Sequence, residues 1–350
     1  MSRARGAPVG SALAESGAPT ETGGAVRALE RETEQIAAGS PSCDSDATDG
    51  LGGQKLSREH REIAARDGLS EGALVEALVG AQVVRLRTDW VLMLHRLGAL
   101  GPVIGLTSNK LATIESVAIY RNIATRGSAA QISDAETDLC LFLSEWRAGF
   151  ALLEEGDQGA QRSLQFFDAR GDAVHKVFLG AGGDVEAFDE VVRRQASENQ
   201  RPVLAAGEAS EARSSHPTSR PHSDAGRNDS LPVIDNIDIA SVDVFAGPLS
   251  SRRVAKESLP HVLETAIAAQ MPLLVMVGNR GAVHCYAGPL HELKRLNGWL
   301  TIRDPEFNLH LEESGIESAW VVGKATAEGV VSSLELFDRG GEMILFLGRL

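Results

Sequence analysis

Apolar residues follow a helical spacing in two early segments of the chain and a strand-like pattern later. The segment SREHREIAARDGLSEGALVEALVG carries apolar residues three and four positions apart, with Gly68 as a stop and Ser70 as an N-cap. The segment TDWVLMLHRLGALG predicts a second amphipathic helix that begins at Thr88 or Asp89. Beyond it, short apolar runs alternate with Gly, Asp and Asn, which predicts strands.

Three strands are predicted near the end of each half of the chain. In the first half they are WRAGFALL, RSLQFFD and AVHKVFL, and in the second half they are ESAWVVG, VSSLELFD and EMILFLG. The connections between them are short and contain Gly, which favours antiparallel hairpins over parallel crossovers. Helices followed by strands, without βα alternation, predict an α+β fold.

The two halves are related by an internal repeat. Asn109 in TSNK and Asn279 in VGNR are 170 residues apart, because 279 − 109 = 170, and SLQFFDARGD matches SLELFDRGGE at the same offset. The offset also pairs Pro102 with Pro272, Ile132 with Ile302, Asp134 with Asp304, Leu139 with Leu309, Leu141 with Leu311, Phe150 with Trp320 and Gly159 with Gly329. A duplication of this length predicts two tandem repeats, each with N-terminal helices and a large antiparallel sheet, related by a pseudo-twofold axis.

Composition divides the chain into four segments. Residues 1–54 have no aromatic residues and few apolar β-branched ones, so we expect a disordered tail, in which a short helix around GGAVRALERETEQIAAG is possible. Residues 196–230 are rich in Ser, Pro, Gly and charge, which is typical of a flexible linker. The two repeats are therefore expected at 55–195 and 231–350.

Charge and cysteine usage narrow the class of protein. A formal net charge of −14 disfavours a nucleic-acid partner, because binding phosphate backbones needs clustered Lys and Arg. Three cysteines without a CxxC spacing suit a reducing compartment. No apolar signal region and no membrane span is found in the sequence, so we expect a cytoplasmic protein without membrane insertion. Phosphate-binding loops, HExxH and GxSxG are absent.

Several strings resemble the HemS/ChuS/HmuS family of cytoplasmic haem-utilisation proteins. They are LRTDW, LCLFLSEWRAGFAL and SLQFFDARGDAVHKVFL in the first half, and MVGNRGAVHCYAGPL, NGWLTIRDPEFNLHLEE and SAWVVGKATAEGVVSSLELFDRGGE in the second. The resemblance implies two similar halves and haem bound in a cleft between a sheet and helices. Some members of that family pass haem to a haem oxygenase, and others break the macrocycle to release iron.

The chain departs from the family pattern at the residues that face the haem iron. The family's axial His lies in a helix that resembles W-x-x-M-T-D-x-H-x-F-F, and here the linker stands in its place, with His216 and His222 interpreted as solvated linker residues. The family's Arg in D-L-R-L-F-L is replaced by Cys140, and a further first-half His is replaced by Ile114. This is therefore a divergent member that lacks the usual axial His and distal Arg.

The remaining candidates for haem contact lie mostly in the second half. His284 occupies the repeat-equivalent of Ile114, and His310 that of Cys140, so both histidines are candidate iron ligands and Cys140 is a candidate thiolate. The candidate cofactor-binding residues are His284, His310, Arg280, Cys140, Tyr286 and Lys294. The alternative reading of each is structural: half-buried sheet histidines, a small core cysteine, a packed tyrosine and ordinary surface cations.

The resemblance implies three functions, which stay open at this level. The first is a haem-binding or haem-transfer protein in haem uptake and iron acquisition, with haem as ligand or cargo. The second is a haem-degrading enzyme, and the third is a degenerate paralogue that acts as a protein-interaction module. The partners considered are haem, a haem oxygenase, a haem importer and a second copy in a homodimer; no catalytic residue is assigned.

Overall fold

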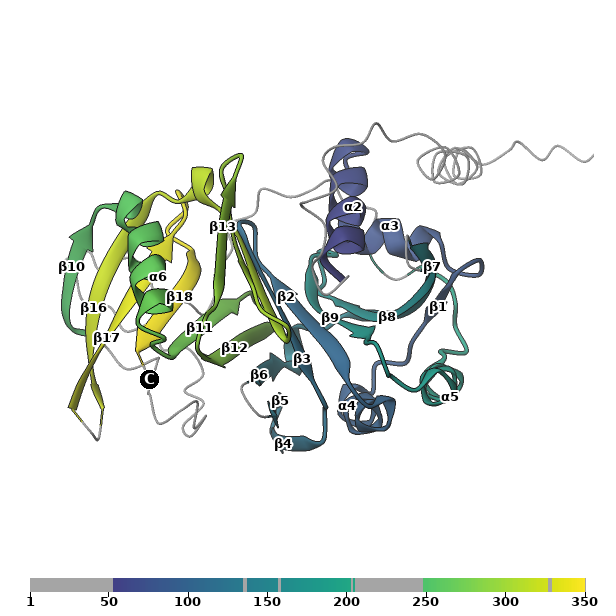
Figure 1. Cartoon of the computed structure of the whole chain (residues 1–350). Coiled ribbons are helices and arrows are strands. Elements are labelled where there is room, and N and C mark those ends of the chain that lie inside the picture. Colours follow the sequence, from purple (N-terminus) through teal and green to yellow (C-terminus); the bar gives the residue numbers. More distant parts are fainter. Residues whose placement is uncertain are drawn as a thin grey trace, which may run out of the picture. The chain divides into compact units, whose positions relative to one another are not determined.

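The computed structural model describes residues 53–134, 137–156, 159–202, 204, 248–326 and 329–349, all within the unit Asp46–Leu350. Figure 1 shows two large sheets with a few helices, so the α+β expectation is confirmed. The α-helices are α2 (Gly53–Arg66), α3 (Glu71–Ala77), α4 (Trp90–Leu97), α5 (Val185–Gln195) and α6 (Leu259–Ala268). The 3₁₀ helices are η1 (Gly98–Leu100), η2 (Leu143–Glu145), η3 (Lys256–Ser258) and η4 (Glu313–Gly315).

Each sheet is antiparallel and has nine strands in the part of the chain that is described. The first sheet runs in the order β1 (Val83–Arg85), β7 (Ala148–Gly156), β8 (Gly159–Phe167), β9 (Ala173–Leu179), β2 (Val103–Ser108), β3 (Ala112–Ala118), β15 (Phe307–Glu312), β14 (Trp299–Arg303) and β13 (Glu292–Leu296). The second runs in the order β10 (Pro248–Val254), β16 (Ser318–Thr326), β17 (Gly329–Phe337), β18 (Met343–Arg349), β11 (Leu273–Gly278), β12 (Ala282–Gly288), β6 (Thr137–Phe142), β5 (Ala129–Asp134) and β4 (Asn122–Arg126).

The two halves exchange three strands each. Strands β13–β15 of the second half complete the first sheet, where His310 on β15 pairs with Thr113 on β3. Strands β4–β6 of the first half complete the second sheet, where Cys140 on β6 pairs with Val283 on β12. Each half therefore supplies six strands to one sheet and three to the other, and neither sheet is built by one half alone.

The repeated asparagines tie the halves together. The side-chain amide of Asn109 donates to the carbonyl of Ile344 at 2.8 Å. Reciprocally, Asn279 donates to the carbonyls of Ser108 and Val174, each at 2.9 Å. Buried backbone carbonyls need such donors, so the repeated Asn has a structural role in joining the halves.

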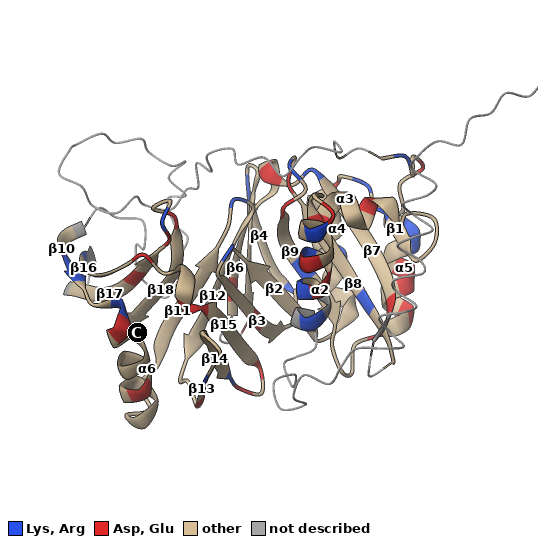
Figure 2. Ribbon diagram, turned by 90° about the horizontal axis from the view of Figure 1, so that it is seen from above, with Lys and Arg blue, Asp and Glu red and all other residues tan. Residues whose placement is uncertain are grey.

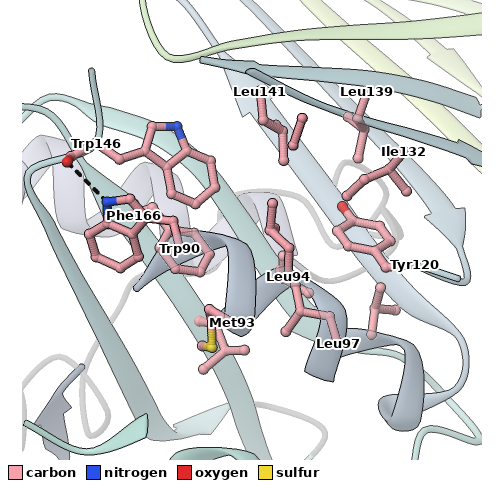
Figure 3. Close-up of a cluster of buried hydrophobic side chains, with 14 of the residues drawn as sticks. Trp90, Met93, Leu94, Leu97, Tyr120, Ile132, Leu139, Leu141, Trp146 and Phe166 are labelled. Atoms are coloured by element: carbon pink, nitrogen blue, oxygen red, sulfur yellow. Dashed lines mark hydrogen bonds between the residues drawn. The ribbon is translucent and has the colours of Figure 1, made fainter. Parts of the chain in front are cut away.

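The space between the sheets is filled by apolar side chains from both. One buried cluster includes Ile114 and Leu309 of the first sheet together with Val275 and Tyr286 of the second. Figure 3 shows the other large cluster, in which α4 lies between Trp146 and Phe166 on one side and Leu139 and Leu141 of the exchanged β6 on the other. We call the faces that meet here the inner faces, and the opposite faces the outer faces.

Helix α2 lies on the outer face of the first sheet, where it contacts β2 and β3. The predicted caps are confirmed: the Ser70 side chain accepts a hydrogen bond from Ala73 N at 3.3 Å, and Asp89 accepts one from Leu92 N at 3.3 Å. Gly68 has a positive φ of 69°, a conformation that ends a helix at little cost only in glycine.

The expected linker does not leave the sheet at its first residue. Ala196 forms a bridge with Leu86, and the amide of Ser197 donates to the carbonyl of Arg85 at 2.8 Å. The segments 205–247 and 1–52, which contain most of the expected linker and tail together with His216 and His222, lie outside the described residues. Among the described helices, none combines the length and apolar character needed to cross a membrane.

Candidate functional site

On the outer face of the first sheet, several buried polar atoms lack hydrogen-bond partners among the described residues. His60 Nδ1 on α2, whose ring contacts Glu154 on β7, and Gln165 Oε1 on β8 lie toward one end of the sheet. His310 Nε2 on β15 and Arg303 Nε on β14 lie on adjacent strands toward the other end. Buried polar atoms are nearly always paired, so the neighbouring unpaired atoms of His310 and Arg303 mark a place where water or a ligand completes the bonding. This face is therefore the strongest candidate site among the described residues.

His310 is the central group of this face. It is only 8% exposed, and its Nδ1 lies 3.3 Å from the hydroxyl of Thr301 on the neighbouring strand. Burial, together with the nearby guanidinium groups of Arg303 and Arg58, lowers the pKa of His310 to about 4. The imidazole is therefore neutral at pH 7, and Nε2 has no hydrogen-bond partner among the residues that the structure describes.

Cationic side chains surround this imidazole. Arg303 forms no ion pair with any residue that the structure describes, whereas Arg58 is paired with Glu62 at 2.7 Å. Lys294 lies in the same cross-strand row, since Lys294 pairs with Thr301 and Thr301 pairs with His310. A neutral imidazole beside an unpaired guanidinium is suited to a ligand that has both a Lewis-acidic centre and an anionic group.

Helix α2 is held over this face mainly by buried polar contacts. The ammonium of Lys176, which is fully buried, donates to Ser57 Oγ at 2.6 Å and forms an ion pair with Glu71. His60 Nε2 lies 2.7 Å from a carboxylate oxygen of Glu154. Figure 2 shows charged residues of both signs along α2. Ser57 and His60 therefore tie α2 to β9 and β7, and the Lys176–Glu71 ion pair ties α3 to β9.

His284 lies elsewhere, between the two sheets. It is fully buried, and its Nε2 bonds to Ser116 Oγ at 2.7 Å. Its ring packs edge-on against His175 with centroids 6.3 Å apart, and His175 in turn bonds to Tyr120 and Thr107 at 2.8 and 2.9 Å. Burial, and then His175, lower the pKa of His284 well below its ordinary value.

The other predicted residues are dispersed. Tyr286 stacks on Phe307 at 4.0 Å in the core between the sheets, and its hydroxyl donates to the carbonyl of Pro289. Cys140 is buried on the outer face of the second sheet, where burial and Asp138 raise the pKa of its thiol to about 12. Arg280, which follows β11, lies near Asp172, and Asp172 is in the turn between β8 and β9.

The fold thus brings together only two of the six predicted residues, His310 and Lys294. His284 and His310 lie on opposite faces of the first sheet, since His284 meets β3 from the inner face through Ser116. Sequence reasoning missed Thr301 and Arg303, although both alternate with buried Leu300 and Ile302 in the run LTIR, which places their side chains on the other face.

Comparisons with known proteins agree with the fold. The family model for the haemin-degrading HemS/ChuX domain matches residues 68–195 and 239–347. The hemin transport protein HmuS of Yersinia pestis is 32% identical over 294 residues, which cover 81% of this chain and 85% of that protein.

Two solved structures are similar over most of the chain. Holo-PhuS, a heme-binding protein from Pseudomonas aeruginosa, has a TM-score of 0.73 and 32% identity, covering 95% of this chain and 94% of its own. ChuS, described as an E. coli heme oxygenase, has a TM-score of 0.70 and 29% identity, covering 85% and 92%. The chain belongs to the HemS/ChuX family of haem-utilisation proteins.

Proposed function

We propose that this protein binds haem in the cytoplasm and passes it on, as part of haem uptake and iron acquisition. Family membership supports haem as the ligand, since its relatives include a hemin transport protein and a heme-binding protein. The observation that carries the proposal is His310, a neutral imidazole with an unpaired Nε2 beside an unpaired guanidinium.

His310 has the properties that an axial haem ligand needs. Iron takes the lone pair of a neutral imidazole nitrogen, and a pKa of about 4 keeps His310 neutral at pH 7. When Nδ1–H donates to Thr301 Oγ1, the lone pair resides on Nε2, the nitrogen that has no partner. Arg303 and Arg58 would then hold the propionates, because guanidinium groups pair strongly with carboxylates.

Transfer is favoured over degradation by what stands in place of the distal Arg. Oxidative opening of the macrocycle needs a polar group that controls the iron face opposite the axial ligand. The residue that replaces the family's Arg is Cys140, which lies on the outer face of the second sheet and so does not face an iron bound at His310. Its thiol is protonated at pH 7, because burial raises its pKa to about 12. Haem iron that is held by a single His ligand is suited to a protein that must release its haem again.

A hemin titration followed by Soret absorbance tests this function. We expect a saturable one-to-one shift for the full chain, and a loss of affinity of at least about tenfold in His310→Ala, the size of effect seen when metal-site residues are removed. His291→Ala is the matched control, because His291 is a half-exposed histidine immediately before β13 and is paired with Asp304. Equal affinities of the two variants would contradict the assignment of His310.

A product assay separates the remaining alternatives. The haem-loaded protein is expected to retain its Soret band when reductant and oxygen are supplied. It is expected to lose this band only when a haem-free protein that accepts haem is added. Formation of a ring-opened product would instead make the chain a haem-degrading enzyme. If hemin causes no shift beyond that seen with an unrelated acidic protein, the chain is a degenerate paralogue, and protein partners become the subject of study.

A further inference from the structure

Strand β1, at the edge of the first sheet, is covered by a later part of the chain. Ala196 forms a bridge with Leu86, which directly follows β1. The amide of Ser197 donates to the carbonyl of Arg85 at 2.8 Å, and the Gln200 side chain bonds the amide and the carbonyl of Arg85 at 2.9 and 3.1 Å. Edge strands present backbone groups to which other strands can pair, so residues 196–200 occupy the place of an added strand.

Strand β10 has the same place in the second sheet, but the described residues do not cover it. Arg85 pairs with Phe150. Arg253 pairs with Trp320, the repeat-equivalent of Phe150, so Arg253 is the counterpart of Arg85. In the described part of the chain, β10 has β16 as its one neighbouring strand, and no backbone hydrogen bond reaches its other side. Figure 1 shows β10 at the end of the sheet, where its seven residues leave one edge open.

The counterpart in β1 shows which backbone groups of β10 point to the open edge. The amide and carbonyl of Arg85 point away from β7, since they bond to Gln200 and Ser197. Arg253 has the same register against β16, so its amide and carbonyl also point outward. Backbone groups two residues apart on a strand point the same way, so those of Ser251 point outward too. Strand β10 therefore offers the amides and carbonyls of Ser251 and Arg253 to an added strand.

The side chains along this edge are basic and apolar. Arg252 and Arg253 are exposed, and neither forms an ion pair with a residue that the structure describes; Arg253 Nη2 lies 3.5 Å from the carbonyl of Glu317. Successive residues alternate, so the two guanidinium groups extend on opposite faces of the sheet. Leu249 is 64% exposed, and Trp320 beside Arg253 is half-buried. Figure 2 shows the basic residues of β10 in blue, and Arg and Trp are enriched where proteins bind one another.

We propose that the open edge of β10 binds an extended acidic segment of a partner protein, which adds to the second sheet as a further strand. The backbone of that segment pairs with Ser251 and Arg253, and two neighbouring carboxylates pair with Arg252 and Arg253, one on each face. A second copy of the chain is a poor occupant, because pairing β10 with itself gathers two arginines of each chain along one short edge. The docking edge requires no bound haem.

Fluorescence anisotropy of a labelled peptide, Thr-Val-Glu-Glu-Val-Thr-Val, with the full chain tests the proposal. We expect saturable one-to-one binding that weakens as salt is raised, and none by the same peptide with Lys in place of Glu. Ser251→Pro removes one outward amide and keeps the pairing of β10 with β16, so binding should weaken at least about tenfold. Ser251→Ala is the matched control, because it keeps that amide. Arg252→Gln and Arg253→Gln should each weaken binding by about threefold or more.

Hydrogen exchange on the unmodified chain keeps the test valid if Ser251→Pro fails to fold. The acidic peptide should slow amide exchange in β10 and leave β4, at the other edge of the same sheet, unchanged. Equal binding of the acidic and basic peptides, or equal affinities of Ser251→Pro and Ser251→Ala, overturns the proposal. Absence of binding by the full chain also overturns it, whether the edge is closed by the chain itself or by a second copy, which a dimer on size-exclusion chromatography would reveal.

Discussion

The buried histidine at the junction of the halves makes a quantitative prediction about acid stability. His175 is 1% exposed, accepts or donates hydrogen bonds at both ring nitrogens, and has its pKa lowered to about 3 by burial. In the unfolded chain the same group titrates near 6.5. Between these values the unfolded state binds one more proton than the folded state, so the free energy of unfolding falls as the pH falls.

The size of the effect follows from the number of protons. One proton contributes about 1.4 kcal/mol per pH unit, so His175 alone costs about 2 kcal/mol of stability between pH 6.5 and pH 5. The contribution is fully present above pH 6.5 and is lost progressively down to about pH 3. Replacing His175 with Gln removes the titrating group and should therefore flatten the pH dependence by about 1.4 kcal/mol per unit in this window.

Urea unfolding followed by far-UV circular dichroism at pH 7, 6 and 5 measures the two slopes. Tyr120→Phe is the matched control, because it removes the 2.8 Å hydrogen bond to His175 but keeps the imidazole. We expect Tyr120→Phe to lose about 1–3 kcal/mol at every pH with an unchanged slope. Identical slopes for the native chain and His175→Gln would refute the reasoning.

Three further predictions concern the site, the helix above it and the exchanged strands. Thr301→Val should weaken hemin binding, and Thr301→Ser should restore it, because only a hydroxyl holds the Nδ1–H of the neighbouring imidazole; Soret titration measures both. Lys176→Met should cost about 3–5 kcal/mol by leaving the Glu71 carboxylate buried alone, and adding Glu71→Leu should recover most of it in urea unfolding. Segments 1–204 and 205–350 produced as separate chains should form a one-to-one complex on size-exclusion chromatography, because three strands of each complete the other's sheet; two independent monomers would contradict the strand exchange.

Local features of the fold were readable from the residues because each has a short-range cause. Ser70 and Asp89 cap helices as predicted, since a side-chain oxygen that satisfies backbone amides two or three residues on needs no distant partner. The 170-residue repeat predicted two similar halves, and the turns between the last strands predicted antiparallel pairing. The family resemblance came from the same strings and is confirmed by the family match.

The placement of the site depended on tertiary structure. Period-two alternation shows that Thr301 and Arg303 share a face with each other, but it does not show whether that face meets the other sheet or the exterior. In the sequence, His284 and His310 are both strand histidines, at the repeat-equivalents of Ile114 and Cys140. Only the strand exchange puts one between the sheets beside His175 and leaves the other beside α2.

The sequence by itself determined the strands, the caps, the duplication and the family, because these depend on neighbours along the chain. The tertiary structure decided which strands pair across the halves and which polar atoms are left without partners. The physical reason is that backbone hydrogen bonds between strands are the same for every residue type, so pairing is chosen by packing of whole faces. Arg303 shows the result: an ordinary arginine in the sequence becomes an unpaired cation beside a neutral imidazole.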